Sequence, residues 1–573
     1  MANCSLETYD YIIAGAGTSG LVIANHLSTD PSTIVAIIET GENVRNNPNV
    51  TSPLDYLAAF NTSIDWQYDI PAQPGAGGRE MMYHAGKAIG GTSTINGMTY
   101  IRGDKPEIDV WEALGSEGWN WENLWPYYKK VEDLTPPTEE QVAVGASYVS
   151  EFHGRDGLLK TGFPYELMNG SFHETARQSW ESLGYPLNPD MNGGDVRGFS
   201  VWPMTVDRDA DVREDAARAF YYPFEERPNL KIIKGAVKRV IWKESTKKCR
   251  DVVAQGVEYL TQDGEVVSAV AKREVILSAG AVRTPLILEL SGVGSQRLLA
   301  KYGIETVIDL PGVGENLQDQ PLAFLSYSGD TGSTSGIAPF ATFINGYDMF
   351  GNETAAIAKS TKASLASWAA EVFAANDGII SAEALEKVFN IQHDLIFNKN
   401  VTIGEILTTL SAGHYVGVFW PLLPFSRGSV HLKSTDAIDD PVIDPNYLLL
   451  DFDLAMATGT GRVAQSLFNQ EPISERITGN VLPGEEALPR NATDSQWKDF
   501  LVGQISPNHH ALGTASMMLR ELGGVVDSKL KVYGTKNVRV VDASVIPLQI
   551  SGHLTSTLYA VAERASEIIM GSS

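Results

Sequence analysis

The sequence predicts a mixed α/β protein of several domains, built around an N-terminal βαβ unit. Three observations carry this prediction. The chain has 573 residues, which is enough for three or four domains of ordinary size. With 43% hydrophobic and 20% charged residues, its composition is that of a globular protein rather than a disordered one. Residues 9–39 then read as a strand, a glycine turn, a helix and a second strand.

The glycine turn of this unit has the residue pattern of a dinucleotide site. Gly15 permits a tight turn after the strand at 9–14, and Gly20 lets the helix at 21–27 pack closely on the sheet. Gly17 lets the backbone approach a pyrophosphate, which is attracted to the positive end of the helix. Thr18 and Ser19 complete the predicted phosphate loop.

An acidic residue closes the second strand of the unit. Glu39 follows the apolar run 34–38, where a carboxylate accepts hydrogen bonds from a ribose 2′-hydroxyl. A 2′-phosphate would be repelled there, so NADP is disfavoured. The pattern by itself does not separate FAD from NAD.

A second glycine-rich segment, residues 86–100, pairs two glycines with small hydroxyl residues. Such a loop can lie against a flat ring or a phosphate, although a plain glycine turn before a strand is the alternative interpretation. The residues of this segment that we expect at the nucleotide are Gly90, Gly91, Thr92, Asn96, Gly97, Met98 and Thr99.

Three further segments follow in order: 280–294, 310–319 and 538–547. Together with 86–100 they resemble, position by position, the shared motifs of the glucose–methanol–choline (GMC) oxidoreductase family. The resemblance extends from one end of the chain to the other and implies FAD as cofactor. It places Asp542 at the ribityl chain or the adjoining phosphates and adds Ala543, His553 and Leu554 to the cofactor site. In 280–294, Pro285 is expected to open a helix.

The family resemblance also implies an architecture. A Rossmann-like FAD-binding domain would be interleaved with an antiparallel-sheet domain that binds substrate. The FAD-binding domain would comprise residues 1–50, 80–110, 228–318 and 525–573, and the substrate-binding or cap domain residues 51–79, 111–227 and 319–524. The second domain would include a helical stretch at 354–389, and residues 134–140 are expected to form a surface loop.

Oxidation of an alcohol requires a base for the hydroxyl proton, and histidine suits this task because its ordinary pKa is about 6.5. His510 and His553 are the candidates. Two core histidines are the alternative, but their spacing resembles the histidine pair of the glucose oxidase and fungal glucose dehydrogenase branch. That resemblance implies that His510 accepts the proton and that His553 hydrogen-bonds the substrate oxygen. His509 is interpreted as structural, and no metal site is expected.

Softer matches surround this pair. Glu405 aligns with a carboxylate that orients the second histidine and belongs to the catalytic set, unless it is a surface helix residue. Tyr68 and Trp420 match aromatic walls of the substrate pocket, although both could equally be core residues. Ile95 occupies the place at which some family members tether FAD through a histidine, so the flavin should be bound non-covalently.

The substrate is where the resemblance weakens. Ser506 occupies the position at which glucose-specific members carry a sugar-binding arginine, and Asn508 lies beside it in the expected substrate site. Without a forked donor, a polyol loses hydrogen bonds. We therefore expect poor turnover of glucose and a preference for another sugar, a glycoside, or an aryl or aliphatic alcohol. The electron acceptor is open between a quinone or dye, which is slightly favoured, and oxygen; a hydroxynitrile lyase is the remote alternative.

Charge and cysteine content limit the partners and the cellular location. The net charge of −26 disfavours nucleic acid and anionic membranes. Cys4 and Cys249 are the only cysteines and allow one bridge at most. We expect a monomer or homodimer, secreted as a glycoprotein, with an intracellular location as the alternative. Asn-x-Ser/Thr sequons begin at Asn3, Asn49, Asn61, Asn169, Asn352, Asn400 and Asn491.

Overall fold

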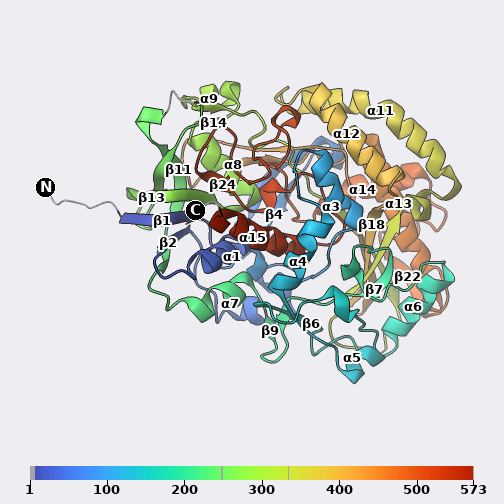
Figure 1. Cartoon of the computed structure of the whole chain (residues 1–573). Coiled ribbons are helices and arrows are strands. Elements are labelled where there is room, and N and C mark those ends of the chain that lie inside the picture. The colour runs from blue at the N-terminus through green and yellow to red at the C-terminus, as the bar shows by residue number, and fades with distance from the viewer. Residues whose placement is uncertain (1–6, 247–249, 333, 572–573) are drawn as a thin grey trace.

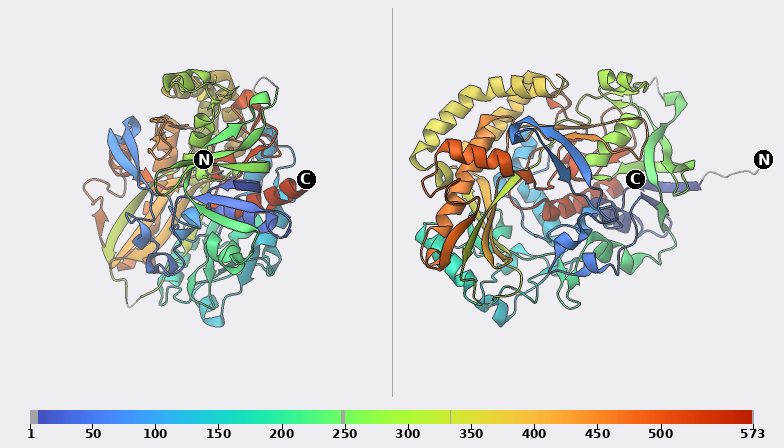
Figure 2. Two further views of the ribbon diagram at one scale, coloured as in Figure 1. Left: turned by 90° about the vertical axis from the view of Figure 1, so that its left-hand side faces the viewer. Right: turned by 180° about the vertical axis from the view of Figure 1, so that it is seen from behind.

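The computed structural model describes residues 7–246, 250–332 and 334–571. Two seven-stranded sheets lie towards opposite ends of the molecule, and helices surround both (Figures 1 and 2). The predicted mixed α/β class is thereby confirmed. Cys4, Cys249 and the Asn3 sequon lie outside the described residues.

The N-terminal βαβ unit forms as the sequence predicts. Strand β1 (Glu7–Ala14) pairs in parallel with β2 (Val35–Glu39), and α1 (Thr18–Leu27) connects them. Gly15 has φ +102°, a left-handed conformation that glycine adopts without strain. A Cβ atom on Gly20 would lie 2.2 Å from the carbonyl oxygen of Gly15, so only glycine fits between helix and turn.

The first sheet extends this unit with strands from distant parts of the chain. Its order is β10-β2-β1-β13-β12-β11, with β24 paired to β13. The added strands are β10 (Leu230–Lys234), β11 (Ala236–Trp242), β12 (Ala254–Leu260), β13 (Val266–Leu277) and β24 (Val538–Val540). The C-terminal helix α15 (Leu554–Gly571) packs against α1 and α4 (Trp121–Val131), so the two ends of the chain share one core (Figure 1).

The second sheet is antiparallel and has the order β22-β16-β19-β18-β17-β7, with β23 paired to β16. Its strands are β7 (Gly198–Val201), β16 (Pro321–Gly329), β17 (Phe340–Asn345), β18 (Thr402–Ser411), β19 (His414–Pro421), β22 (Ile477–Leu482) and β23 (Ser506–Pro507). Helix α13 (Asp451–Phe468) covers one face of β16, β18 and β19. The side chains of the opposite face are therefore available to a binding site.

Both sheets draw their strands from the segments predicted for the two domains, although the predicted boundaries themselves stay predictions. The helical stretch predicted at 354–389 is two helices, α11 (Thr354–Ala375) and α12 (Ala382–Phe397). Asp377 and Gly378, both at positive φ, separate them. The loop predicted at 134–140 is shorter than expected, because β5 (Glu132–Thr135) and α5 (Glu139–Ala143) occupy its ends.

The prediction for Pro285 is wrong by more than one helical turn. Helix α8 (Gly280–Leu290) begins five residues earlier, so Pro285 lies inside it. A proline there cannot donate to the carbonyl of Ala281, four residues before it. The hydroxyl of Thr514 donates to that carbonyl instead, at 2.6 Å, and so satisfies the group that the proline leaves unpaired.

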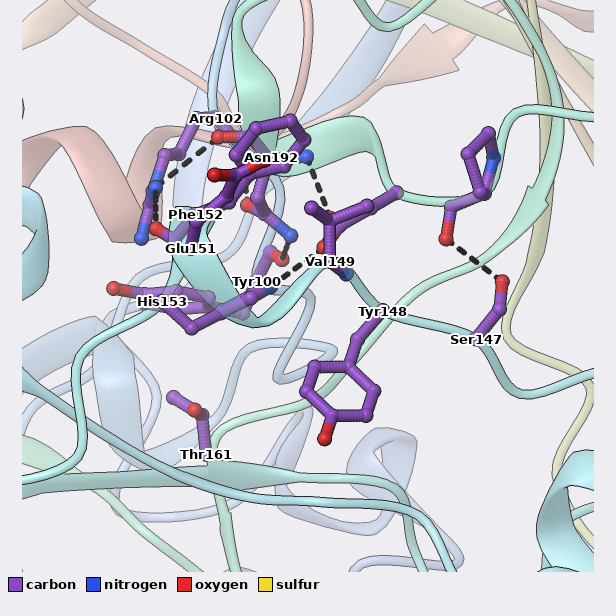
Figure 3. A network of polar contacts seen from close by, with 12 residues as sticks. Tyr100, Arg102, Ser147, Tyr148, Val149, Glu151, Phe152, His153, Thr161 and Asn192 are labelled. Atoms are coloured by element: carbon purple, nitrogen blue, oxygen red, sulfur yellow. Dashed lines mark hydrogen bonds and ion pairs between the residues drawn. The ribbon is translucent and has the colours of Figure 1, made fainter.

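A buried ionic network connects Arg102, shortly after the second glycine segment, to β5, and Figure 3 shows Arg102, Phe152 and His153 of this network. Arg102 donates to Glu132 at 2.9 Å and to the carbonyl of Phe152 at 2.7 Å. His153 lies 2.8 Å from both Glu132 and Asp190. Burial opposes a charge on this imidazole, but the two carboxylates outweigh it and raise the pKa of His153 to about 9.

The sequon asparagines that the structure describes are all at least partly accessible, as glycan acceptors must be. Asn49 is half-buried, and the exposed ones are Asn61, Asn169, Asn352, Asn400 and Asn491. Glycosylation and secretion stay predictions. Within the described residues we find no helix with both the length and the apolar character that a membrane span requires. The same residues contain no group of three or more His, Cys, Asp or Glu side chains that could hold a metal ion.

Candidate active site

A cavity of about 1080 Å³ is lined by residues of both sheets. This volume is slightly larger than the roughly 300–1,000 Å³ typical of ligand sites. Fifteen of the predicted cofactor residues line it: Gly15, Gly17, Thr18, Ser19, Glu39, Gly91, Thr92, Asn96, Gly97, Met98, Thr99, Asp542, Ala543, His553 and Leu554. Gly20 and Gly90 are set back from it. Gly90 has φ +113°, and its Cβ would meet Thr94 at 2.5 Å, so these two glycines serve close packing of the backbone.

At the nucleotide end of the cavity, no side chain of the described residues covers the backbone at the positively polarised N-terminus of α1. A Cβ on Gly17 would meet only atoms 3.9 Å away, which leaves the start of α1 open for a phosphate. Glu39 accepts from the backbone N–H groups of Ala16 at 2.7 Å and Gly41 at 2.5 Å. Each carboxylate oxygen keeps a lone pair for a ribose hydroxyl. These residues fit the adenosine and pyrophosphate parts of FAD.

Asp542 has a local structural role in addition to the one predicted for it. Its carboxylate accepts from the backbone N–H of Gly280 at 2.9 Å and from the hydroxyl of Thr284 at 2.6 Å. Its other oxygen accepts from Ser544. Asp542 therefore anchors the first turn of α8, whose N-terminal residues also line the cavity. Contact of the same carboxylate with a ribityl chain or phosphate stays a prediction.

Ile95 lines the cavity within the 3₁₀ turn region after Gly91 and is buried. An isoleucine has no atom that could form a bond to the flavin ring. At this position the chain therefore offers a packing surface and no tether.

The structure brings the two predicted histidines together at the cavity. The ring centroids of His510 and His553 are 5.0 Å apart, and the rings are inclined by 76°. His553 directly precedes α15, which packs beside the first sheet, and His510 follows β23 of the second sheet. The pair therefore lies where the two parts of the fold meet. Burial, followed by the nearby His553 and His509, holds the pKa of His510 well below its usual range. His510 is consequently neutral and able to accept a proton at ordinary pH.

Glu405 is buried on β18, so the alternative of an exposed helical residue is wrong. Its carboxylate lies 3.0 Å from Nε2 of His553 and fixes that ring. Nδ1 of His553 is left to meet a ligand. Glu405 does not line the cavity, so its contact with the site runs through His553.

The side chain of His509 packs among aromatic rings and does not share the hydrogen-bond partners of His510. Its Nδ1 accepts from the backbone N–H of His84 at 3.2 Å, and the rings of Phe60, Tyr83 and His84 surround it. Burial lowers the pKa of His509 to about 3. Because His509 also lines the cavity, its purely structural role stays a prediction.

The four predicted substrate-site residues besides His510 all line the cavity: Tyr68, Trp420, Ser506 and Asn508. Tyr68 stacks on Trp66, and its hydroxyl accepts from Arg283 at 3.0 Å. Trp420 lies against His553 with ring centroids 5.8 Å apart. The indole N–H of Trp420 and the side-chain amide nitrogen of Asn508 are buried and have no hydrogen-bond partner within the described chain.

Sequence reasoning missed an apolar wall of the same cavity. Leu322 of β16, Leu407 of β18 and Val418 of β19 line it together with Trp420. Leu407 and Val418 are directly opposed, as are Glu405 and Trp420, so these side chains lie on the sheet face that α13 does not cover. The sequence shows that these residues alternate with buried ones along each strand. It does not show which strands pair with each other.

Sequence reasoning also missed two cations at the cavity, Lys87 and Arg283. The ammonium group of Lys87 lies 4.5 Å from the ring centroid of Trp66, and the guanidinium group of Arg283 lies 4.3 Å from it. Sequence reasoning also passed over Asp319 and Gln320, which follow each other in the chain. It recognised the segment 310–319, which contains Asp319, but gave neither residue a role.

Comparison with known proteins places this site in a family. Sequence profiles described as "GMC oxidoreductase" match residues 9–322 and 424–562. The chain belongs to the GMC oxidoreductase family. This GMC oxidoreductase is 50% identical to "Glucose oxidase-like protein fsoC" of Humicola fuscoatra over 99% of the chain and 96% of that protein. It is 34% identical to "Glucose oxidase" of Penicillium chrysogenum, over 98% of the chain and 92% of that protein.

A solved structure, an FAD-dependent oxidoreductase from Chaetomium thermophilum, superposes with a TM-score of 0.89 at 29% identity. The match covers 98% of this chain and 99% of that one. The GMC oxidoreductase described here is thus an FAD-dependent enzyme acting on CH–OH groups, with an FAD-binding part and a substrate-binding part. The predicted family, fold class, cofactor and enzyme class are confirmed.

Proposed function

We propose that this enzyme oxidises alcohols whose hydroxyl-bearing carbon carries an apolar or aromatic group, with His510 as the base. The observation that carries the proposal is the position of the neutral His510, 5.0 Å from His553 by ring centroids, beside the wall of Leu322, Leu407, Val418 and Trp420. A polyol would leave hydroxyl groups unpaired against such a wall, whereas an aryl or alkyl group would bury apolar area there.

Each residue then has a defined task. Nε2 of His510 takes the hydroxyl proton, and Nδ1 of His553, oriented by Glu405, hydrogen-bonds the substrate oxygen. When bound, FAD supplies an acceptor for the hydride from the same carbon, so that the alcohol loses two electrons and two hydrogens. Trp420 and the three aliphatic side chains exclude water from the reacting carbon.

Ser506 supports the same choice of substrate. It is part of the two-residue strand β23, where it pairs with Leu322 of the apolar wall. A serine hydroxyl offers one donor, whereas the arginine at this place in the glucose-specific branch would offer several. Glucose should therefore be a poor substrate, although glucose oxidases are among the relatives.

The test is a panel of alcohols and sugars mixed anaerobically with the purified holoenzyme. We expect benzyl alcohol and a medium-chain primary alcohol to abolish the visible absorbance of the flavin faster than glucose or xylose does. Faster reduction by glucose would contradict the proposed substrate class. Absence of bleaching with every compound would contradict oxidation altogether and would favour the hydroxynitrile lyase alternative.

The electron acceptor is tested on the same reduced samples. We propose a quinone or dye as the preferred acceptor, so benzoquinone should restore the absorbance faster than dissolved oxygen at equal concentration. Faster return with oxygen would make the enzyme an oxidase.

A further inference from the structure

The segment that leads into β16 contacts the base of the reaction through consecutive side chains. Gln320 is 1% exposed, and its side-chain oxygen lies 2.8 Å from Nδ1 of His510. Asp319 accepts from the backbone N–H of His510 at 2.8 Å. We propose that Gln320 is a positioning residue that fixes the tautomer of His510, an inference that rests on the proposed function.

The hydrogen bonds of Gln320 allow only one orientation of its amide group. Its nitrogen donates to the carbonyl of Leu422 at 3.0 Å, and a carbonyl oxygen can only accept. The amide oxygen of Gln320 must therefore be the atom that faces His510. Because this oxygen cannot donate, Nδ1 of His510 carries the hydrogen.

The tautomer decides what His510 can do. A neutral imidazole has one hydrogen, so a hydrogen on Nδ1 leaves Nε2 with its lone pair. Nε2 lies on the side of the ring away from Gln320, and His510 lines the cavity. The base therefore faces the substrate. The other tautomer would present an N–H donor to the hydroxyl group and could not take its proton.

The backbone around His510 is held as firmly as its ring. The side-chain amide of Gln549 donates to the carbonyl of His510 at 2.8 Å, and the backbone N–H of Gln549 donates to Gln318 at 3.2 Å. With Asp319 on the amide side, both peptide groups of His510 are fixed. The ring can then respond to Gln320 without a shift of the main chain.

The charged and titratable groups around His510 come from several elements. His553 precedes α15, Glu405 of β18 lies behind it, and His509 and Asp319 flank the backbone. Burial raises the pKa of Asp319 to about 6, while the hydroxyl of Tyr447 donates to it. None of these groups contacts Nδ1 of His510, so the neutral amide of Gln320 is the group that sets its hydrogen.

The experiment compares Gln320→Leu, which removes the acceptor, with Gln320→Glu, which keeps the shape and an oxygen facing Nδ1. Flavin reduction is followed anaerobically by stopped flow with the best alcohol of the panel. Gln320→Leu should lower the limiting rate of reduction at least about tenfold, with little change in the substrate concentration for half saturation. Gln320→Glu should recover most of that loss at neutral pH.

The pH profile adds a readout that a purely structural role would not move. Reduction needs a neutral His510, so its rate falls at acid pH. An ionised carboxylate at position 320 favours the imidazolium form, and Gln320→Glu should therefore lose rate at a higher pH than wild type, by about one unit or more.

The matched control is Gln465→Leu. Gln465 is also a buried amide, donates to the carbonyl of Leu488, and does not line the cavity. The flavin of the Gln465→Leu variant should be reduced at the wild-type rate. The inference would be overturned if Gln320→Leu were reduced as fast as wild type. It would also be overturned if Gln320→Leu and Gln320→Glu lost rate equally while both retained FAD, as judged by absorbance. Failure of the wild type to be reduced would instead contradict the proposed function.

Discussion

At the scale of single residues, the site works by giving two similar imidazoles different environments. His510 is half-buried beside the neutral amide of Gln320, and its lowered pKa keeps the ring neutral. His553 meets the carboxylate of Glu405, which holds a hydrogen on the Nε2 side when ionised. We propose that the first ring accepts the proton of the substrate and that the second is held in place beside the substrate oxygen.

Residue identity was predictable where the chemistry demands one residue type. The two histidines were proposed from the sequence because few side chains can serve as a base near neutral pH and because their spacing resembles the histidine pair of the glucose oxidase branch. Gln320 was not found, since a glutamine has many ordinary roles and its partner lies 190 positions away in the sequence. Glu405 was recognised only through resemblance, and its strand became evident from the structure.

At the scale of elements, the glycine turn is predictable because its conformation permits so few residues. We expect Gly20→Ala to displace α1 from Gly15, because the added Cβ would lie 2.2 Å from a carbonyl oxygen. The cost should be about 1–3 kcal/mol of unfolding free energy. Thermal unfolding and the flavin content of the purified variant measure this loss.

Gly503→Ala is the control for this substitution. Gly503 lies in α14 (Asp494–Gln504), and a Cβ there would meet nothing within 4 Å. Alanine should leave stability unchanged or raise it by up to about 1 kcal/mol. A Gly20→Ala protein with wild-type melting temperature and full flavin content would show that the close contact is not needed.

Other elements could not be placed from the sequence, for identifiable reasons. Pro285 was expected to open α8, but the hydroxyl of Thr514, far along the chain, lets the helix continue through it. The apolar wall depends on which strands face each other, and Leu407 and Val418 meet only through the register of β18 and β19. Such long-range pairing leaves no local trace in the sequence.

At the scale of the whole molecule, buried histidines make stability depend on pH. The pKa of His153 is raised to about 9 by Glu132 and Asp190, and that of His431 to about 10 by Glu289 and Glu315, in each case against burial. A raised pKa means that the folded state holds a proton that the unfolded chain releases above about 6.5. Their contribution is complete below that pH and is lost as pH rises to 9 and 10.

We therefore expect the melting temperature to fall as pH rises from 6.5 to 9. Burial also raises the pKa of Glu214 to about 8, which acts in the same direction up to that pH. His153→Gln should be less stable at pH 6.5, because it removes the cation between two buried carboxylates and leaves Glu132 with Arg102 alone, and its melting temperature should vary less with pH. A wild-type melting temperature that is constant or rising over this interval would contradict the assignment.

The central claim is that His510 takes the proton of the substrate alcohol, and anaerobic stopped-flow reduction of His510→Ala tests it most directly. Loss of a positioned base lowers rates by roughly 10²–10⁴-fold. We predict a loss of at least a hundredfold in the rate of flavin reduction, with FAD retained and an unchanged visible spectrum before mixing. Reduction of this variant at the wild-type rate would contradict the account.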